Sequence, residues 1–97
     1  MYIVVTTVEV EPGSVDRLAE LFDSTNRDLV APHDDWIAAY FTANRSTNMV
    51  TVIAHWREAA SYEVLRSSAE FQSTMAQFAE SFVGPPQVSV NEVLVEM

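Results

Sequence analysis

The sequence predicts a single α+β domain whose elements follow the order β-α-β-β-α-β. Two patterns lead to this prediction: stretches rich in β-branched residues with alternating faces, and stretches whose apolar residues recur every three or four positions. Clusters of Pro, Gly and Asn separate these stretches. The length of 97 residues fits one domain, so residues 1–97 are expected to fold as one unit.

The apolar content is sufficient for a core, although the chain is short. Hydrophobic residues make up 48% of the sequence, whereas a domain of this size hides only about 60–70% of the surface that its unfolded chain exposes. Several of the predicted strands are apolar on both faces. We therefore expect a second copy of the chain to cover part of this surface in a homodimer.

The charge balance restricts the classes of partner and of chemistry. The formal net charge is −9, from 14 Asp and Glu against 5 basic residues, all of them Arg. Without Lys the chain has no Schiff-base lysine, and without a basic patch it is not expected to bind nucleic acid. The absence of Cys excludes disulfides, thiolate nucleophiles, iron–sulfur clusters and thiolate zinc sites.

Nothing in the sequence predicts insertion into a membrane. No apolar run approaches the ~20 residues of a membrane-spanning helix, and the chain opens directly into a strand rather than a signal peptide. The expected location is therefore cytoplasmic, with no membrane partner.

The first two predicted elements are a strand and a long helix. Residues 2–11 are rich in β-branched side chains, and one face of this strand carries Tyr2, Val4, Thr6, Val8 and Val10. Ser14 is expected to cap a helix over residues 14–29, which Pro32 ends. Its inner face is expected to carry Val15, Leu18, Ala19, Phe22, Asn26 and Leu29.

A hairpin is expected next, with strands over residues 35–43 and 49–56 joined by the polar turn 44–48. Neither face of the first strand is polar, which favours burial on both sides.

The remainder of the chain is predicted to be helical up to a last strand over residues 88–97. Tyr62 and Leu65 lie three apart, on one face of a short helix that follows the strand 49–56. Ser67 and Glu70 match a capping box, so another helix is expected to start there and to end before Gly84. Its apolar face consists of Phe71, Met75, Phe78 and Phe82.

The simplest packing of these elements is the ferredoxin-like arrangement, a four-stranded antiparallel sheet with the helices on one face. The other face of the sheet would be apolar and exposed in a monomer. A two-fold partner that stacks sheet to sheet would cover it, and the two copies would form a dimeric α/β barrel.

The residues best suited to chemistry lie where the strand 49–56 meets the following helix. Trp56 ends the strand, while Tyr62 and Arg66 are four apart and hence on one face of the helix. Arg66 can either anchor an anionic oxygen of a ligand or pair with a neighbouring Glu on the surface. His55 precedes Trp56 and is therefore expected on the opposite face of the sheet.

A second polar cluster, His33-Asp34-Asp35, has residue types that bind metals. Adjacent side chains diverge in an extended loop, so a solvated turn is the preferred interpretation and no metal site is predicted.

The stretch MVTVIAHWREAASYEVLRSSAEFQ, residues 49–72, resembles the antibiotic biosynthesis monooxygenase family. Members of this family are dimeric α/β-barrel proteins. In them an apolar strand ends in Trp, an acidic or small residue begins a helix, and a Ser-x-x-Phe segment follows. The corresponding residues here are Trp56, Glu58-Ala59-Ala60 and Ser68 to Phe71.

The resemblance implies a cofactor-independent monooxygenase that acts on a hydrophobic aromatic or polyketide-type phenol or enol. In the quinone-forming members a Trp and a Tyr six residues apart line the substrate cavity, and Trp56 and Tyr62 stand at that spacing as the expected catalytic pair. A phenolate or enolate can pass an electron to dioxygen directly, so no metal or organic cofactor is expected. The expected substrate-binding residues are Arg66, His55, Phe71 and Phe78.

Some positions depart from the family pattern. The quinone-forming members also carry an Asn four residues before the Trp and an Arg roughly twenty residues after it, where this chain has Val52 and Ala76. The haem-degrading members have an iron-binding His where this chain has Arg66, which cannot ligate iron. Two alternatives therefore stay open. One is an isomerase, cyclase or lyase that uses His55 or a carboxylate as base, and the other is a non-catalytic dimeric binding module.

Overall fold

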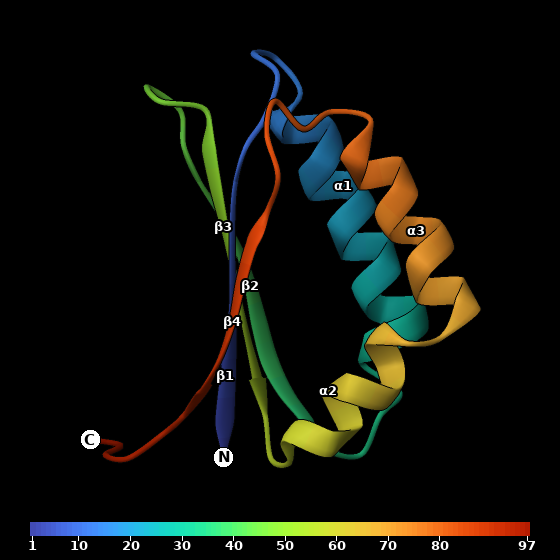
Figure 1. Ribbon diagram of the computed structural model, residues 1–97, viewed down its shortest axis with the longest axis vertical. Coiled ribbons are helices and arrows are strands. Elements are labelled where there is room, and N and C mark those ends of the chain that lie inside the picture. The colour runs from blue at the N-terminus through green and yellow to red at the C-terminus, as the bar shows by residue number, and fades with distance from the viewer.

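The computed structural model describes residues 1–97 and contains a four-stranded sheet and three α-helices. The strands pair antiparallel in the order β2-β3-β1-β4. All helices lie on one face of the sheet and leave the other face uncovered (Figure 1). The predicted ferredoxin-like α+β fold is thus confirmed. The elements in chain order are β1 (Tyr2–Glu9), α1 (Val15–Thr25), η1 (Asn26–Val30), β2 (Trp36–Asn44), β3 (Met49–Trp56), α2 (Ala59–Arg66), α3 (Ala69–Ala79) and β4 (Gln87–Glu92).

The inner face of the sheet, which faces the helices, carries the residues that the alternation in β1 predicts. Val4, Val8 and Val10 are buried there. The fully buried side chains do not form one continuous core but two separate clusters. The first contains Val8, Val10, Val15, Leu18, Val50 and Phe78, and the second contains Val4, Val30, Trp56, Tyr62 and Leu65.

Helix α1 continues as one π-helical turn, η1, in which the Ala31 N–H donates to the Asn26 carbonyl at 2.7 Å. A π-helical turn contains more residues than an α-helical one, so the inward-facing positions after Asn26 are displaced along the chain. Val30 is accordingly buried, whereas Leu29, which a regular α-helix would place inward, is only partly buried. The predicted helix is present, but its last turn differs from the expected geometry.

The two predicted caps differ from expectation. Ser14 precedes α1, but its hydroxyl donates to the Glu11 carbonyl and accepts no bond from the helix. Helix α3 is capped by Ser68 instead of Ser67: the Ser68 hydroxyl oxygen accepts from the Phe71 N–H at 3.2 Å. Ser67 instead closes the end of α2, so the capping-box assignment was displaced by one residue.

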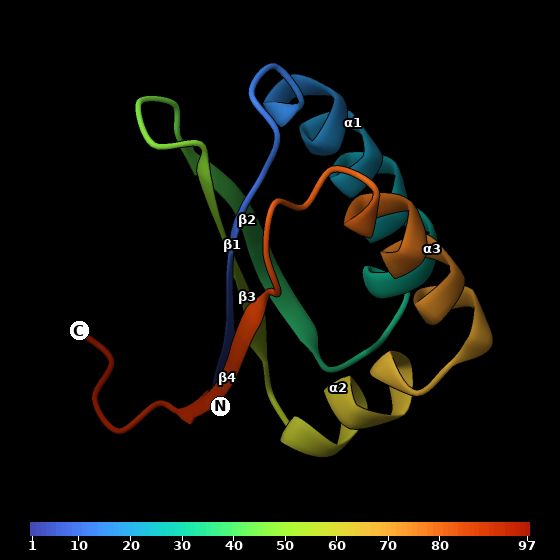
Figure 2. The same ribbon diagram turned by 45° about the horizontal axis from the view of Figure 1, so that its top comes forward.

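Strand β4 ends at Glu92, five residues before the predicted end. Glu92 pairs with Tyr2, the first residue of β1, so the chain beyond Glu92 has no strand beside it with which to pair. The last residues extend away from the domain (Figure 2) and expose Leu94, Val95 and Met97.

The outer face of the sheet, which no helix covers, is largely apolar near its centre. Val5 of β1 pairs with Ile53 of β3, which in turn pairs with Tyr40 of β2. The Tyr40 side chain is 57% exposed. Strand β2 is therefore not buried on both sides within one chain, as its composition suggested. None of the helices combines the length and the apolar character needed to cross a membrane.

Candidate active site

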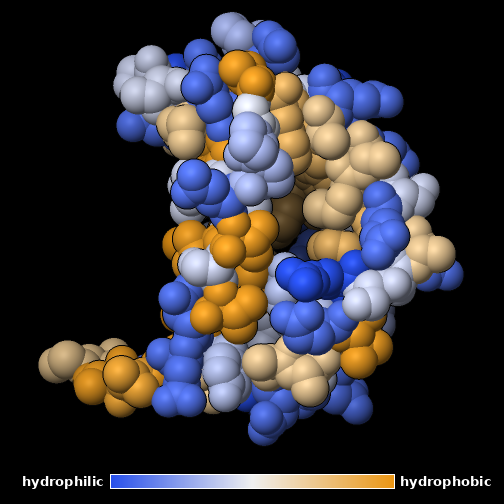
Figure 3. Space-filling model, in the orientation of Figure 1, coloured by the Kyte–Doolittle hydropathy of each residue, from blue (hydrophilic) through white to orange (hydrophobic).

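A cavity of about 130 Å³ lies between the sheet and the helices. Figure 3 shows a hollow between the β4 edge of the sheet and the helices, with apolar atoms on its upper wall and hydrophilic atoms at its lower rim. Members of both core clusters line the cavity, so it lies where the two clusters do not meet. Nearly all of its lining is apolar, which makes it a site for a hydrophobic molecule.

Trp56, the first member of the expected catalytic pair, lines the cavity from the end of β3. Its side chain is only 1% exposed, and its ring centre lies 6.2 Å from that of Tyr62. The His33 ring also contacts the Trp56 ring in a T-shaped arrangement, with 5.9 Å between ring centres. The indole Nε1–H is buried without a hydrogen-bond partner. Buried donors are normally paired; the indole Nε1–H of Trp36 is likewise buried without a partner.

Tyr62, the second member of the pair, projects from α2 into the same cavity and is 9% exposed. Burial raises the pKa of the Tyr62 phenol above its usual range, and the positive charge of Arg66 offsets part of this rise. The phenol therefore keeps its proton at neutral pH and is available as a hydrogen-bond donor. The predicted Trp–Tyr spacing thus corresponds to two neighbouring rings at one end of the cavity.

Helix α2 is held in this position by the loop before β2. The Ser61 hydroxyl, in the first turn of α2, donates to the Asp35 carboxylate. Arg57, between β3 and α2, donates to the Asp34 carbonyl at 2.6 Å. The loop that the sequence marked as a weak metal candidate therefore has a structural role. No group of three or more His, Cys, Asp or Glu side chains in the molecule is placed to hold a metal ion.

Arg66 does not line the cavity. Its Nε lies 3.3 Å from the Glu63 carboxylate, and both side chains are about half exposed. Of the two roles considered for Arg66, the structure thus shows the surface ion pair. The guanidinium still lies near enough to Tyr62 to influence the pKa of its phenol.

Phe71 and Phe78 both line the cavity from α3, as the helical spacing predicted. Phe78 is buried, whereas Phe71 is partly exposed. They belong to different core clusters and thus form two separate parts of the apolar wall.

His55 is on the outer face of the sheet, on the side away from the cavity. Its ring meets that of Tyr40 edge to face, with 6.4 Å between ring centres, and it takes no part in the cavity lining. The cavity contains no imidazole or carboxylate, and Tyr62 is its only titratable side chain. A reaction that needs a strong general base has no candidate inside it.

Three polar residues of the lining were not among the expected site residues: Thr6 of β1, Thr25 of α1 and Asn26 of η1. The sequence contains a signal for two of them. Thr6 interrupts an otherwise apolar alternation, and Asn26 interrupts the apolar face of the helix. Val52 also lines the cavity, whereas Ala76 is exposed on α3. The position where the quinone-forming members carry Asn is thus an apolar wall in this chain.

The chain resembles solved structures along its whole length. A protein solved as an antibiotic biosynthesis monooxygenase is 11% identical with a TM-score of 0.81, covering 98% of this chain and 100% of that chain. Rv0793 from Mycobacterium tuberculosis is 18% identical with a TM-score of 0.80, covering 98% and 96%. A conserved protein from Methanosarcina mazei is 16% identical with a TM-score of 0.80, covering 92% and 88%. At such identities the likeness shows the fold alone.

Sequence comparison gives the family. No curated protein matches the sequence. The family model described as antibiotic biosynthesis monooxygenase matches residues 1–77, which include β1 to β3, α2 and most of α3. The chain therefore belongs to the antibiotic biosynthesis monooxygenase family.

Proposed function

We propose that the protein is a cofactor-independent monooxygenase that oxidises a small hydrophobic phenol or enol to a quinone. The observation that carries this proposal is the apolar cavity with Trp56 and Tyr62 side by side at one end. The family description supports the reaction class. The cavity supports the substrate class, because its lining is suited to a flat, uncharged ring.

The size of the cavity favours one ring. Its volume is about 130 Å³, close to the engineered cavity of about 150 Å³ that binds benzene. A polycyclic substrate would insert one ring and leave the others in the open mouth between β4 and the helices (Figure 3). Exposed Val88 and Val90 of β4 offer apolar surface for the part that projects.

In this proposal Trp56 and Tyr62 act on the ring that is being oxidised. The Trp56 indole contributes an apolar face and its unpaired N–H. The protonated Tyr62 hydroxyl donates a hydrogen bond to the ring oxygen as negative charge develops there. Phe71 and Phe78 enclose the ring from α3.

The reaction balances without an external reductant. A phenol and one dioxygen give a quinone and one water: one oxygen atom forms the new carbonyl and the other leaves as water with two hydrogens from the substrate. All four electrons that reduce dioxygen come from the substrate. Because Tyr62, the only titratable side chain of the cavity, keeps its proton, the substrate is expected to lose its phenolic proton to solvent near the mouth.

We also propose that two copies associate through the outer face of the sheet. Ile3, Val5 and Ile53 form an apolar surface there beside the exposed Tyr40, and no part of the same chain covers it. Stacking of two such faces is a common packing of sheets. His55 lies on this face and would take part in the dimer rather than in the cavity.

Oxygen uptake tests the enzymatic proposal. Purified protein is supplied with 1-naphthol or anthrone, and dioxygen consumption is recorded together with product absorbance. Trp56→Phe and Tyr62→Phe are expected to reduce turnover at least about tenfold, the effect of one lost transition-state hydrogen bond or more. Tyr40→Phe removes a hydroxyl on the outer face and is the matched control. Full turnover in both cavity variants would show that the wrong residues are assigned.

The same cavity supports a second function, binding without chemistry. The observation in its favour is the apolar Val52 at a position where the quinone-forming members carry Asn. Ligand binding with no oxygen uptake would favour this function. Turnover that continues without oxygen would instead favour an isomerase, cyclase or lyase, although His55 lies outside the cavity.

A further inference from the structure

We propose that Asn26 determines the specificity of the cavity, by hydrogen bonding through its side-chain amide to a hydroxyl or carbonyl oxygen of the bound ring. The role of Asn26 in turnover rests on the proposed oxygenase function, but its role in binding does not. The ligand class that follows is a small aromatic ring carrying at least one oxygen, in preference to a plain hydrocarbon of the same size.

The first observation is the position of Asn26 in the core pattern. On the inner side of α1 and η1, Leu18 belongs to one buried cluster and Val30 to the other. Asn26 stands between them and lines the cavity that separates the clusters. Thr6 of β1 likewise stands between the buried Val4 and Val8 and lines the cavity from the sheet. Both layers thus place a polar residue at the otherwise apolar cavity.

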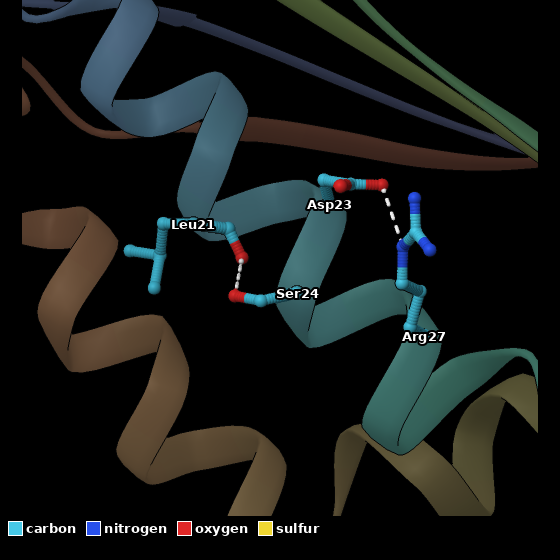
Figure 4. A network of polar contacts seen from close by, with 4 residues as sticks. All are labelled: Leu21, Asp23, Ser24 and Arg27. Carbon is cyan, nitrogen blue, oxygen red and sulfur yellow. Dashed lines mark hydrogen bonds and ion pairs between the residues drawn. The ribbon is translucent and has the colours of Figure 1, made fainter.

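The second observation is that the amide of Asn26 is free. Two nearby polar side chains, Ser24 and Arg27, have partners on the helix itself, as Figure 4 shows. Arg27 Nε donates to the Asp23 carboxylate at 3.1 Å, and the Ser24 hydroxyl donates to the Leu21 carbonyl at 3.1 Å. The Asn26 side chain makes no hydrogen bond within the chain, although it is partly buried against the cavity.

The third observation is the backbone at the same residue. Asn26 begins the π-helical turn, and its own N–H and carbonyl are both hydrogen-bonded within the helix. Its side chain is therefore not needed to satisfy the helix. Asn is also a poorer helix former than Leu or Ala, and π-helical turns occur frequently at functional sites. A polar side chain that makes no hydrogen bond in the chain and lines a cavity is suited to bind a ligand.

The side-chain amide of Asn26 can hydrogen bond to both the substrate and the product of the proposed reaction. The Asn26 amide has a donor and an acceptor, so it can accept from the hydroxyl of a phenol and donate to the carbonyl of a quinone. As a neutral group it avoids the large desolvation penalty of a charged side chain in an apolar cavity. It would bind substrate and product alike while rejecting rings that have no oxygen.

Phenol and toluene, which differ by a hydroxyl in place of a methyl group, test this inference. Dissociation constants are measured for both without oxygen, by ligand-observed NMR or calorimetry. In the wild type phenol is expected to bind more tightly than toluene. Asn26→Leu is expected to lower the ratio of toluene to phenol dissociation constants about tenfold, the effect of one lost hydrogen bond in a dry site. Gln72→Leu, on the exposed side of α3, is the control.

A thermal unfolding measurement separates this role from a structural one. Asn26→Leu is expected to unfold at the same temperature as the wild type or higher, because it places an apolar side chain against an apolar cavity. If Asn26→Leu fails to fold, the ratio of toluene to phenol dissociation constants is measured in Asn26→Ala instead, because Ala is a strong helix former.

Each outcome decides the inference. An unchanged ratio in the Asn26 variants, or a wild type that does not prefer phenol, overturns it. A lowered ratio without any oxygen uptake supports Asn26 and refutes the proposed oxygenase. Oxygen uptake with an unchanged ratio supports the oxygenase and refutes the role of Asn26.

Discussion

Replacement of Trp56 by Phe tests whether this indole is placed for a ligand or for stability. The side chain is 1% exposed, and its Nε1–H has no partner. An unsatisfied buried donor costs about 1–3 kcal/mol, and the Phe variant removes that cost. The variant also loses the burial of about two ring carbons, roughly 2 kcal/mol at ~0.8 kcal/mol for each. The two effects oppose each other.

The free energy of unfolding of Trp56→Phe is therefore expected to lie within about 1 kcal/mol of the wild-type value. Trp56→Ala removes the whole ring and is expected to lose about 3–5 kcal/mol. Leu18 is buried and has no polar atom in its side chain. Leu18→Ala is therefore the reference for loss of apolar packing alone, with an expected loss of about 3–5 kcal/mol in the free energy of unfolding.

Urea denaturation followed by circular dichroism and by the fluorescence of the remaining Trp36 measures these differences. The slopes of the transitions must agree among variants for the free energies to be compared. If Trp56→Phe lost as much stability as Trp56→Ala, the indole N–H would not be an unsatisfied donor. The argument that it is available to a ligand would then be wrong.

Three further predictions follow from single features of the molecule. Burial raises the pKa of Tyr62 above its ordinary value of 10.0, so the native state holds the phenolic proton more tightly than the unfolded chain. The stability that protonated Tyr62 contributes is complete below about pH 10 and is lost as pH rises through the native pKa. The free energy of unfolding, measured by urea titration above about pH 10, should therefore fall more steeply with pH in the wild type than in Tyr62→Phe. Gly13 has a φ of +84° with no atom within 4 Å of an added Cβ; Gly13→Ala should therefore lose about 1–2 kcal/mol in the same assay through backbone strain alone, and no loss would contradict this. Ile53→Asp places a charge at the centre of the outer face and should convert the proposed dimer to a monomer in light scattering, whereas Thr47→Asp in the hairpin turn should not.

Most of the fold could be predicted because its determinants are local in sequence. The alternation of Val4, Thr6 and Val8 identifies a strand with one buried face, and the spacing of Phe71, Met75 and Phe78 identifies a helix with one apolar side. Both patterns persist in the structure because the same apolar side chains meet between the layers.

The ion pair of Arg66, the cavity and the π-helical turn could not be predicted, because they depend on how side chains and backbone groups are placed in space. The spacing of Tyr62 and Arg66 placed both on one helix face, but only the positions of the side chains show that Arg66 pairs with Glu63. A cavity is the volume that side chains of separate elements fail to fill, so no local pattern predicts it. The π-helical turn at Asn26 depends on competition between hydrogen bonds that differ little in energy, which propensities do not resolve.

The division of the buried residues into two clusters affects how the domain opens. Regions that share few buried contacts can open separately, and amides near the gap, such as those of Thr6 and Val52, are expected to exchange with solvent before those at the cluster centres. A ring that fills the cavity would contact both clusters and join them into one cooperative unit. At a hundred times its dissociation constant a ligand adds about 2.7 kcal/mol to stability. Substrate concentration would thus control local opening and resistance to proteolysis as well as turnover.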